Sequence, residues 1–308
     1  MKYYLIYNPT ARSGRSKIEF KKIIEILKDR NIDFDYALTT KKDEAIDIAS
    51  GITKNKTDVI VAVGGDGTMG EVITGLMRQS RQNRPILGVL HIGTSPDFPR
   101  YHGIPIQTDE ATDFLLKAKP ALIDIGKVAY HSLINGEITT SYFGCNVNIG
   151  LGPQIASKYG NRYRTILGDF GGTLLATLVS LAFYKNAKAS LMVDDNKIEL
   201  NNLINLTAGK DPYLASGMRV PVDICANDGK MFYLSLQSKS KIKLLGQLWR
   251  LYKGNILDFP GAKFCRAQKI VIESEDLSLV EFDGDVRGCL PAMVEIMPCE
   301  IPLLKVIS

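Results

Sequence analysis

Residues 58–71 read DVIVAVGGDGTMGE, and this stretch decides the fold. Asp58–Val63 is apolar after its first residue, which is typical of a strand covered on both faces of a sheet. The segment Gly64–Gly67 contains three glycines and predicts a turn. A helix is expected to begin at Thr68, because Thr68 with Glu71 three residues later has the spacing of a capping box.

This turn is suited to a phosphate group. Glycine lets the backbone approach an anion without a Cβ in the way, and the amides of a following helix N-terminus attract it. Asp66 would repel a phosphate unless it faced a metal ion or a hydroxyl, which indicates Mg²⁺ nearby. The stretch is neither a P-loop nor a G-x-G-x-x-G fingerprint, and a plain strand–turn–helix connection uses the same glycines. The motif alone leaves both interpretations open.

The first 120 residues alternate predicted strands and helices. This order predicts a parallel sheet with right-handed crossovers, whose ligands gather at the carboxyl ends of the strands. We expect strands at Tyr3–Tyr7, Phe34–Leu38, Asp58–Val63 and Ile86–Ile92, and helices from about Ser16, around Ala45, Ile48, Ala49 and Ile52, and from Thr68.

A second loop is expected at the edge of the sheet where the glycine turn lies. Gly93–Arg100 reads GTSPDFPR and directly follows the strand Ile86–Ile92. Asp97 and Arg100 are interpreted as an ion pair that orders a phosphate site. The alternative for Arg100 is an exposed charge without a function.

After Pro120 the pattern changes to antiparallel β-structure with inserted helices. Asn135-Gly136 predicts a type I′ hairpin, and Asp194–Asn196 predicts a second tight turn. Further strands are expected at Ala189–Val193, Lys197–Leu200, Leu203–Thr207, Met231–Leu236, Lys269–Glu273 and Ser278–Phe282, and helices at Gln154–Ile166, Thr173–Lys185 and Lys241–Lys253. We therefore predict one domain over residues 1–120 and a β-rich domain over residues 121–300.

Composition and charge exclude several classes of protein. The five cysteines are widely spaced and never form C-x-x-C, so neither a zinc site nor a disulfide framework is expected. The three histidines offer no hydrolytic triad. The apolar runs are too short for a signal peptide or a spanning helix, which predicts a cytoplasmic protein. The basic amphipathic segment Ser238–Asn255 fits an ordinary surface helix or a helix on an anionic membrane, and both stay open.

With these residues in view, the chain resembles the diacylglycerol kinase catalytic family, bacterial lipid kinases that are related to sphingosine kinases and more distantly to NAD kinases. The loop Gly93–Arg100 is similar to the family's G-T-x-N-D-F-x-R, with Pro96 in place of the Asn. The other matching segments are Tyr7–Pro9 with Gly14, Gly64–Thr68 with Glu71, Asn146–Gly152, Leu167-Gly168, Met218–Pro221 with Asp228-Gly229, and Phe282–Gly284.

The resemblance implies an N-terminal Rossmann-like parallel α/β nucleotide domain, followed by a C-terminal antiparallel β-sandwich-like domain that carries helices. Residues 301–308 are expected to return to the first domain. The residues implied to contact the nucleotide are Asn8, Thr39, Gly64, Gly65, Asp66, Gly67, Thr68, Glu71 and Thr94. The implied charge network consists of Asp97, Arg100 and Asp124.

The resemblance also implies catalytic and metal-binding positions in the second domain. Asp283 lies in the element that supplies the general base, and Asp285 stands where the family has Glu in its D-G-E element. Asp228, with the carbonyls of Cys225 and Lys230, is similar to a structural Mg²⁺ position.

The implied function is an ATP-dependent lipid kinase that transfers the γ-phosphoryl group to a lipid hydroxyl, with ATP and Mg²⁺ as cofactors. A diacylglycerol-like lipid alcohol is the expected substrate, peripheral membrane contact and a homodimer are left open, and no nucleic-acid partner is expected. One alternative is a nicotinamide nucleotide (NAD) kinase-like phosphotransferase. The other is a catalytically silent nucleotide- or lipid-binding relative, which Pro96 and Asp285 would favour.

Overall fold

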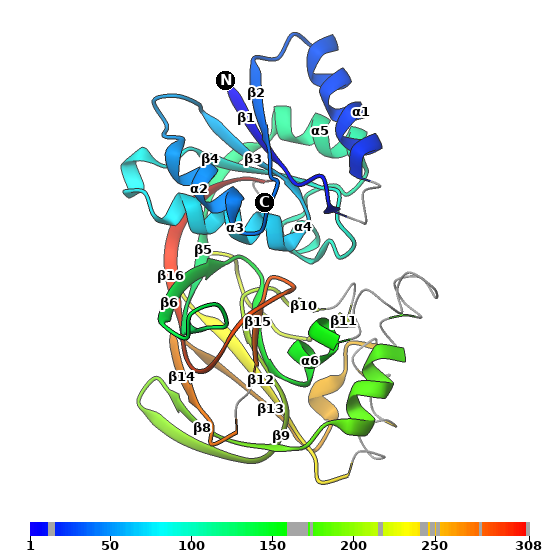
Figure 1. Ribbon diagram of the computed structural model, residues 1–308, viewed down its shortest axis with the longest axis vertical. Helices are drawn as coiled ribbons and strands as arrows, with labels where there is room; N and C mark the ends of the chain where they lie inside the picture. Colours follow the sequence, from blue (N-terminus) through cyan, green and yellow to red (C-terminus); the bar gives the residue numbers. More distant parts are fainter. Residues whose placement is uncertain are drawn as a thin grey trace. The chain divides into compact units, whose positions relative to one another are not determined.

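The computed structural model divides the chain into two compact units, which are described separately (Figure 1). The first unit comprises Met1–Ile125, Tyr142–Gly144 and Met297–Ser308, and the second comprises Gly126–Ser141 and Cys145–Ile296. The structure describes residues 1–11, 16–158, 172, 175–214, 218–240, 246, 250, 253–276 and 279–305.

A parallel sheet forms the centre of the first unit. Its strand order is β2-β1-β3-β4-β16, and every pairing in it is parallel. The strands are β1 (Tyr3–Tyr7), β2 (Phe34–Leu38), β3 (Val59–Gly64), β4 (Ile86–His91) and the end of β16 (Asp285–Lys305). The alternating strands and helices predicted a parallel sheet, and the pairings confirm it.

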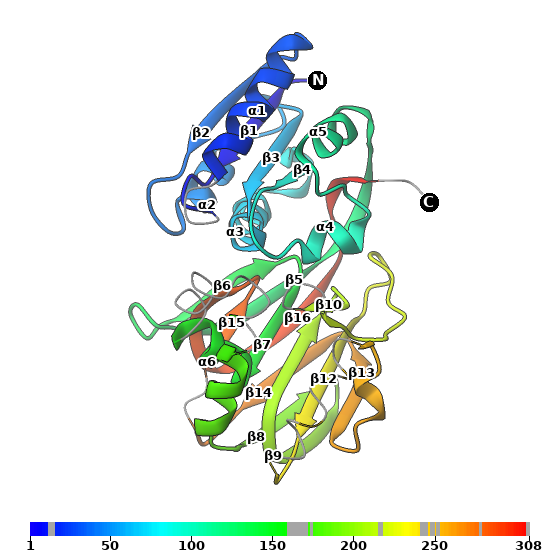
Figure 2. The ribbon, with the colours of Figure 1, turned by 90° about the vertical axis from the view of Figure 1, so that its right-hand side faces the viewer.

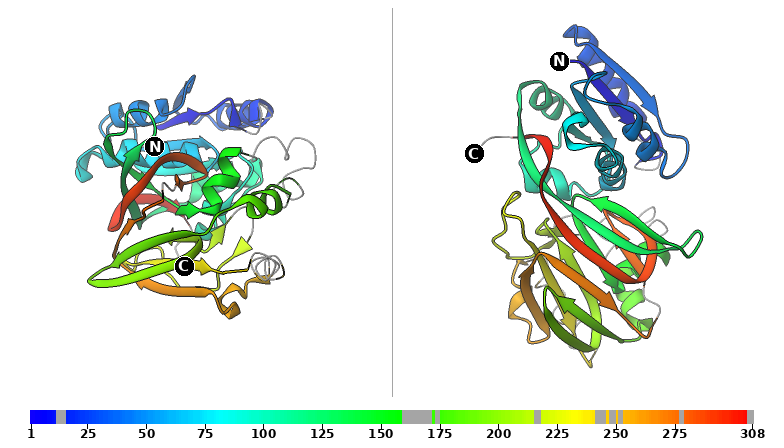
Figure 3. Two further views of the ribbon diagram at one scale, coloured as in Figure 1. Left: turned by 60° about the horizontal axis from the view of Figure 1, so that its bottom comes forward. Right: turned by 90° about the vertical axis from the view of Figure 1, so that its left-hand side faces the viewer.

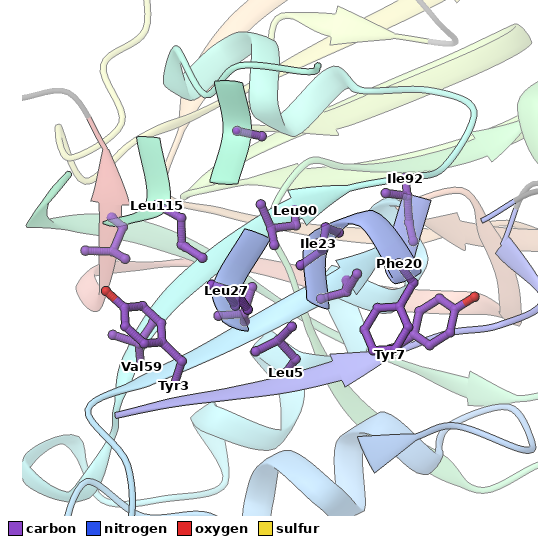
Figure 4. Packing of buried hydrophobic residues seen from close by; sticks show 14 residues of the cluster. Tyr3, Leu5, Tyr7, Phe20, Ile23, Leu27, Val59, Leu90, Ile92 and Leu115 are labelled. Carbon is purple, nitrogen blue, oxygen red and sulfur yellow. The ribbon is translucent and has the colours of Figure 1, made fainter. Parts of the chain in front are cut away.

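Helices cover the sheet of the first unit because both of its faces are apolar. The helices are α1 (Ser16–Asp29), α2 (Glu44–Gly51), α3 (Asp66–Met77), α4 (Asp97–His102) and α5 (Thr108–Lys117), with a short 3-10 helix at Arg81–Asn83. Leu5 packs with Leu27 of α1 and Leu115 of α5 in one buried cluster (Figure 4), to which Val61 also belongs. Figure 2 shows the ribbons of α1 and α5 beside the strands of this sheet. Ile60, which points to the opposite face of β3, is also fully buried.

The start of α3 differs from the prediction. The helix begins at Asp66, with Gly65 as its N-cap in an extended conformation. The predicted capping box of Thr68 and Glu71 is therefore wrong. Both side chains are used elsewhere: Asn8 Nδ2 donates to the Thr68 hydroxyl, and the Asp43 amide donates to Glu71 Oε1.

The second unit is built from antiparallel strands whose pairings close on themselves. The order β7-β9-β8-β14-β16-β15 returns to β7, while β12 and β13 extend from β9. Figure 3 shows the strands of this unit in two further views. The remaining elements are β5 (Lys119–Ser132), β6 (Ile138–Phe143), β7 (Asn146–Gly150), α6 (Leu151–Lys158), β8 (Ala187–Val193), β9 (Asn196–Gly209), β10 (Tyr213–Leu214), β11 (Met218–Arg219), β12 (Met231–Gln237), a 3-10 helix (Ile256–Asp258), β13 (Ala262–Ala267), β14 (Lys269–Glu273) and β15 (Leu279–Phe282).

Two predicted turns have different outcomes. The tight turn at Asp194 is confirmed, since Val193 pairs with Asn196. The type I′ turn at Asn135-Gly136 is wrong: Gly136 has a φ of 73°, but Asn135 is not among the described residues with a positive φ. Its side-chain oxygen instead accepts from the Glu137 amide, in a longer loop between β5 and β6.

Several predicted helices fall partly or wholly outside the described residues. The helix expected at Gln154 begins at Leu151, and residues 175–183 are helical within the predicted Thr173–Lys185. Most of Lys241–Lys253 lies outside the described residues, as do Gly14 and Leu167-Gly168. Over the part of the chain that the structure describes, no helix combines the length and apolarity needed to cross a membrane.

Candidate active site

The carboxyl ends of four parallel strands lie side by side in the first unit. The Thr39 amide donates to the Tyr7 carbonyl (2.9 Å), and the Asn8 amide donates to the Val63 carbonyl (3.0 Å). Gly64 pairs with His91 at the ends of β3 and β4. The structure thus brings the predicted residues Asn8, Thr39 and Gly64 together at the edge of the sheet where α/β proteins bind ligands.

Gly64 and Thr68 are in close steric contact. A Cβ on Gly64 would lie 2.4 Å from Thr68 Oγ1 and 2.6 Å from Thr68 Cβ. The Thr68 hydroxyl accepts a hydrogen bond of 3.0 Å from Asn8 Nδ2, which leaves its own proton available to another acceptor. The glycine is therefore required by packing, in addition to any role in phosphate approach.

The glycine turn and the Gly93 loop touch through their backbones. A Cβ on Gly93 would lie 2.5 Å from Gly65 Cα, and the Ile92 amide donates to the Gly64 carbonyl. The expectation that the two loops share one edge of the sheet is confirmed. Thr94, the next residue, is partly buried. Backbone contact at this point leaves no room for a side chain on Gly93, whereas a Cβ on Gly65 would lie 3.6 Å from Gly93 Cα, an ordinary contact.

The N-terminus of α3 has the features of an anion site. Its N-cap, Gly65, has no side chain with which to satisfy the first amides, and Gly67 follows within the first turn. Asp66 Oδ1 lies 3.6 Å from Nε2 of His91, a side chain that is 2% exposed. Sequence reasoning did not identify His91, although its position at the end of β4 beside Gly64 places it at this edge.

Asp97 is buried at the start of α4 and orders the Gly93 loop. The Ser95 hydroxyl donates to Asp97 Oδ2 (2.8 Å), and Arg100 Nη1 lies 3.4 Å from Asp97 Oδ1. The predicted Asp97–Arg100 pair is present. Pro96, which replaces the family's Asn, is the N-cap residue of α4.

Asp124 is buried in β5 and binds the backbone of β16. Its Oδ1 accepts a hydrogen bond of 2.9 Å from the amide of Cys299, a residue with a φ of 53°. A non-glycine residue with positive φ persists only where its surroundings hold it, and Asp124 supplies such a contact. The charge network of Asp124 with Asp97 and Arg100 stays a prediction.

In the second unit, Asp283 and Gly284 form the two-residue turn between β15 and β16. Phe282 pairs with Asp285, and the two turn residues have φ values of 49° and 84°. Both values are positive, as a type I′ turn requires. The buried carboxylate of Asp283 accepts a 2.9 Å hydrogen bond from the Cys145 amide, which fixes its orientation.

Asp285 is held by an arginine beside the same turn. Arg287 Nη2 lies 3.1 Å from Asp285 Oδ2, and its guanidinium lies over the Phe282 ring, 5.4 Å from the centroid. The Arg287 side chain is 8% exposed. Sequence reasoning missed Arg287, which the i, i+2 spacing from Asp285 on a strand would place on the same face.

Glu281 is a second buried carboxyl group near Asp283. Burial raises its pKa to about 7, against the lowering effect of hydrogen bonds with Asn148 and the Gly284 amide. The charges of Asp285 and Asp283 add to the increase in pKa. A carboxyl group that titrates near neutral pH beside a candidate general base is an unusual feature. No sequence pattern indicated it, because a single Glu in an otherwise apolar strand such as β15 is normally expected to face solvent.

The loop Cys225–Lys230 does not fit a metal ion. Asp228 accepts hydrogen bonds from the Cys225 and Lys230 amides (3.1 Å each), and Lys210 Nζ donates to both Asp228 Oδ1 and the Lys230 carbonyl. A cationic side chain thus binds two of the oxygens that the family resemblance implied as Mg²⁺ ligands. Elsewhere among the described residues, no group of three or more His, Cys, Asp or Glu side chains is placed to hold a metal ion.

Two family models match the chain. Residues 2–128 match the diacylglycerol kinase catalytic domain. Residues 147–305, more than half of the chain, match the YegS C-terminal NAD kinase beta sandwich-like domain. The chain belongs to the family of proteins in which a diacylglycerol kinase catalytic domain is followed by this β-sandwich-like domain.

Individual relatives agree with this assignment. A diacylglycerol kinase of Staphylococcus haemolyticus is 26% identical over 94% of this chain and 83% of its own length. One of Staphylococcus aureus (strain MRSA252) is 28% identical over 94% of this chain and 87% of its own length.

Solved structures share the fold. The crystal structure of a diacylglycerol kinase from Bacillus anthracis str. Sterne has a TM-score of 0.70 at 20% identity, covering 99% of this chain and 97% of its own. Yeast NADH kinase complexed with NADH has a TM-score of 0.55 at 11% identity, covering 100% of this chain and 84% of its own. At these identities the likeness concerns the fold alone.

Proposed function

We propose that this chain is an ATP-dependent lipid kinase that transfers the γ-phosphoryl group of ATP to the hydroxyl of a diacylglycerol-like lipid. The observation that carries the proposal is the backbone contact between Gly65 and Gly93 at the N-terminus of α3, in a chain that matches both family models. The contact forms a turn without side chains that a phosphate can approach.

The first unit is proposed as a Rossmann-like nucleotide domain. The Gly65 and Gly67 amides would donate to the ATP phosphates, and Thr68 would donate the hydroxyl proton that Asn8 leaves available. The Arg100 side chain is 34% exposed and would pair with phosphate oxygens while Asp97 holds it in place. Thr39, Glu71 and Thr94 remain proposed nucleotide neighbours.

Mg²⁺ is proposed to enter with ATP. The Asp66 carboxylate fits this ion, because it lies in the first turn of α3 where the phosphates would bind and carboxylates are common Mg²⁺ ligands. The ion would neutralise negative charge on the phosphates.

The second unit is proposed to carry the proton acceptor and the lipid site. Asp283 would accept the proton of the lipid hydroxyl as that oxygen attacks the γ-phosphorus, and ADP would leave. The Cys145 amide orients the Asp283 carboxylate, and the buried Arg287 holds Asp285. A lipid substrate also implies that the enzyme works at a membrane surface.

Phosphoryl transfer to a panel of acceptors tests this function. Purified protein is incubated with γ-labelled ATP, Mg²⁺ and mixed micelles containing diacylglycerol, with NAD and a reaction without acceptor in parallel. We expect label in the lipid and none in NAD. Label in NAD would establish the soluble-substrate alternative. ATP binding without transfer to any acceptor would establish a catalytically silent relative.

A further inference from the structure

The loop Cys225–Lys230 is organised around one carboxylate. Asp228 Oδ2 accepts from the Cys225 amide, and Asp228 Oδ1 accepts from the Lys230 amide. Gly229, between them, has a φ of 68°, a conformation that glycine adopts without strain. The negative charge of Asp228 thus lies at the centre of a tight turn and requires a cation.

Lys210 supplies that cation from another part of the unit. It directly follows β9, and its backbone amide donates to the Cys145 carbonyl (3.1 Å), which fixes where its side chain begins. Lys210 Nζ lies 2.5 Å from Asp228 Oδ1 and 2.7 Å from the Lys230 carbonyl oxygen. The Lys210 side chain is only 3% exposed, and a lysine this buried is almost always paired.

The direction in which the pKa of Asp228 is shifted agrees with an ionised carboxylate in this turn. Burial alone would raise it, but the hydrogen bonds from Lys210 and from the two loop amides hold the Asp228 pKa below its ordinary value. The Asp228 carboxylate is therefore ionised throughout the neutral range and accepts a hydrogen bond from Lys210 Nζ.

A divalent ion and this ammonium group exclude one another. Mg²⁺ requires near-octahedral oxygen ligands at about 2.0–2.1 Å. Lys210 Nζ already binds Asp228 Oδ1 and the Lys230 carbonyl, two of the oxygens that such an ion would need in this loop. A second cation within a few ångströms would also be repelled.

We propose that the Lys210 ammonium group replaces a structural divalent cation, so that Asp228, the Lys230 carbonyl and Lys210 form a metal-free clamp between the end of β9 and the loop before β12. The loop is then held in place in the absence of any metal. This proposal is independent of the proposed kinase activity, because it concerns the folded state of the second unit without ATP.

Thermal unfolding of the ATP-free protein tests the clamp. The wild-type melting temperature is expected to be the same in EDTA as in millimolar Mg²⁺. Lys210→Met removes the charge at similar side-chain length and is expected to lower the melting temperature by roughly 4–10 °C. The matched control is Lys263→Met, at an exposed position of β13, which should leave the melting temperature nearly unchanged.

The variant should also become sensitive to metal. With the ammonium group absent, Asp228 and the Lys230 carbonyl can accept a divalent ion, so Mg²⁺ or Mn²⁺ should restore part of the lost melting temperature in Lys210→Met but not in Lys263→Met. If Lys210→Met does not fold, the double variant Lys210→Met/Asp228→Asn, which carries no unpaired charge, is expected to fold and to show no metal response.

Three results would overturn the proposal. The first is a wild-type melting temperature that falls in EDTA. The second is elemental analysis that finds one bound Mg²⁺ per ATP-free wild-type chain and none in Asp228→Asn. The third is a Lys210→Met variant as stable as Lys263→Met.

Discussion

At the scale of single residues, glycines and carboxylates of the site are fixed by their immediate contacts. The sequence predicted Gly64 as a turn residue, but its packing against Thr68 became evident only in the structure. The contact of the Asp66 carboxylate with the His91 ring likewise became evident only in the structure. Both contacts depend on how the glycine turn, α3 and the end of β4 are placed in the folded unit, and local sequence patterns carry no information about that placement.

Gly93→Ala is expected to weaken ATP binding by tenfold or more. The new Cβ would lie 2.5 Å from Gly65 Cα. Because the contacting atom belongs to the backbone, the clash can be relieved only by a shift of the glycine turn that is proposed to bind the phosphates. Overpacking of this kind costs about 1–3 kcal/mol. The control is Gly51→Ala, because among the described residues no atom lies within 4 Å of a Cβ at that position. Calorimetric titration with ATP measures the affinity of each variant. Equal ATP affinities in Gly93→Ala and Gly51→Ala would disprove the steric account.

Glu281 should make stability fall as pH rises. Its pKa is about 7 in the folded protein against 4.5 in the unfolded chain, so the native state binds more protons between these values. The loss begins above about pH 4.5, is complete above about pH 7, and amounts to about 3 kcal/mol. Glu281→Gln keeps a hydrogen-bonding side chain and should remove this slope. Urea unfolding measures the free energy of unfolding of wild type and Glu281→Gln at pH 5 and pH 8. The same change with pH in both proteins would contradict the account.

At the scale of elements, regular segments were predicted well, but only some of their ends were. β1, β2 and β14 have the predicted bounds, because their apolar runs end at polar or turn residues. The start of α3 was missed because Thr68 and Glu71 have the spacing of a capping box while their side chains serve Asn8 and Asp43. Tertiary hydrogen bonds outweighed the local pattern.

The end of β16 is expected to depend on one buried ion pair. Arg84 binds Glu300, and their side chains are 8% and 19% exposed. Glu300→Ala leaves the arginine charge buried without its carboxylate, which should lower the free energy of unfolding by roughly 2–4 kcal/mol. Glu295→Ala on the same strand breaks the more exposed pair with Lys127 and should lose less than about 1 kcal/mol. Denaturant unfolding compares the two, and similar losses would refute the distinction.

At the scale of the whole molecule, chain order and compact units do not coincide. Residues 142–144 stand between two segments of the second unit in the sequence, and residues 297–308 follow the second unit. Both segments nevertheless belong to the first unit. The family resemblance implied the return of the C-terminal end, and the parallel pairing of Leu303 with Leu87 is consistent with it. No local pattern marks Tyr142–Gly144, since its place follows from contacts such as that of Tyr142 with Thr74.

The residues of the candidate site were also predictable only where a short sequence motif contains them. Residues of the glycine turn and the Gly93 loop could be proposed from the sequence because short motifs carry them. Lys210, Arg287 and Glu281 could not, because each acts through burial and a distant partner. Burial changes the pKa of a charged side chain and its need for a partner, and the amino-acid composition alone does not reveal which side chains are buried.

The most direct test of the central claim is transfer of label from γ-labelled ATP to diacylglycerol by Asp283→Asn. This variant keeps an oxygen that can accept from the Cys145 amide but removes the carboxylate. The matched control is Asp194→Asn, which changes an aspartate with the same φ of 49° in another hairpin turn of the unit. We predict that Asp283→Asn lowers the rate at least 100-fold with ATP binding retained, whereas Asp194→Asn stays within about twofold of wild type. Equal rates in the two variants would contradict the assignment of Asp283 and with it the proposed mechanism.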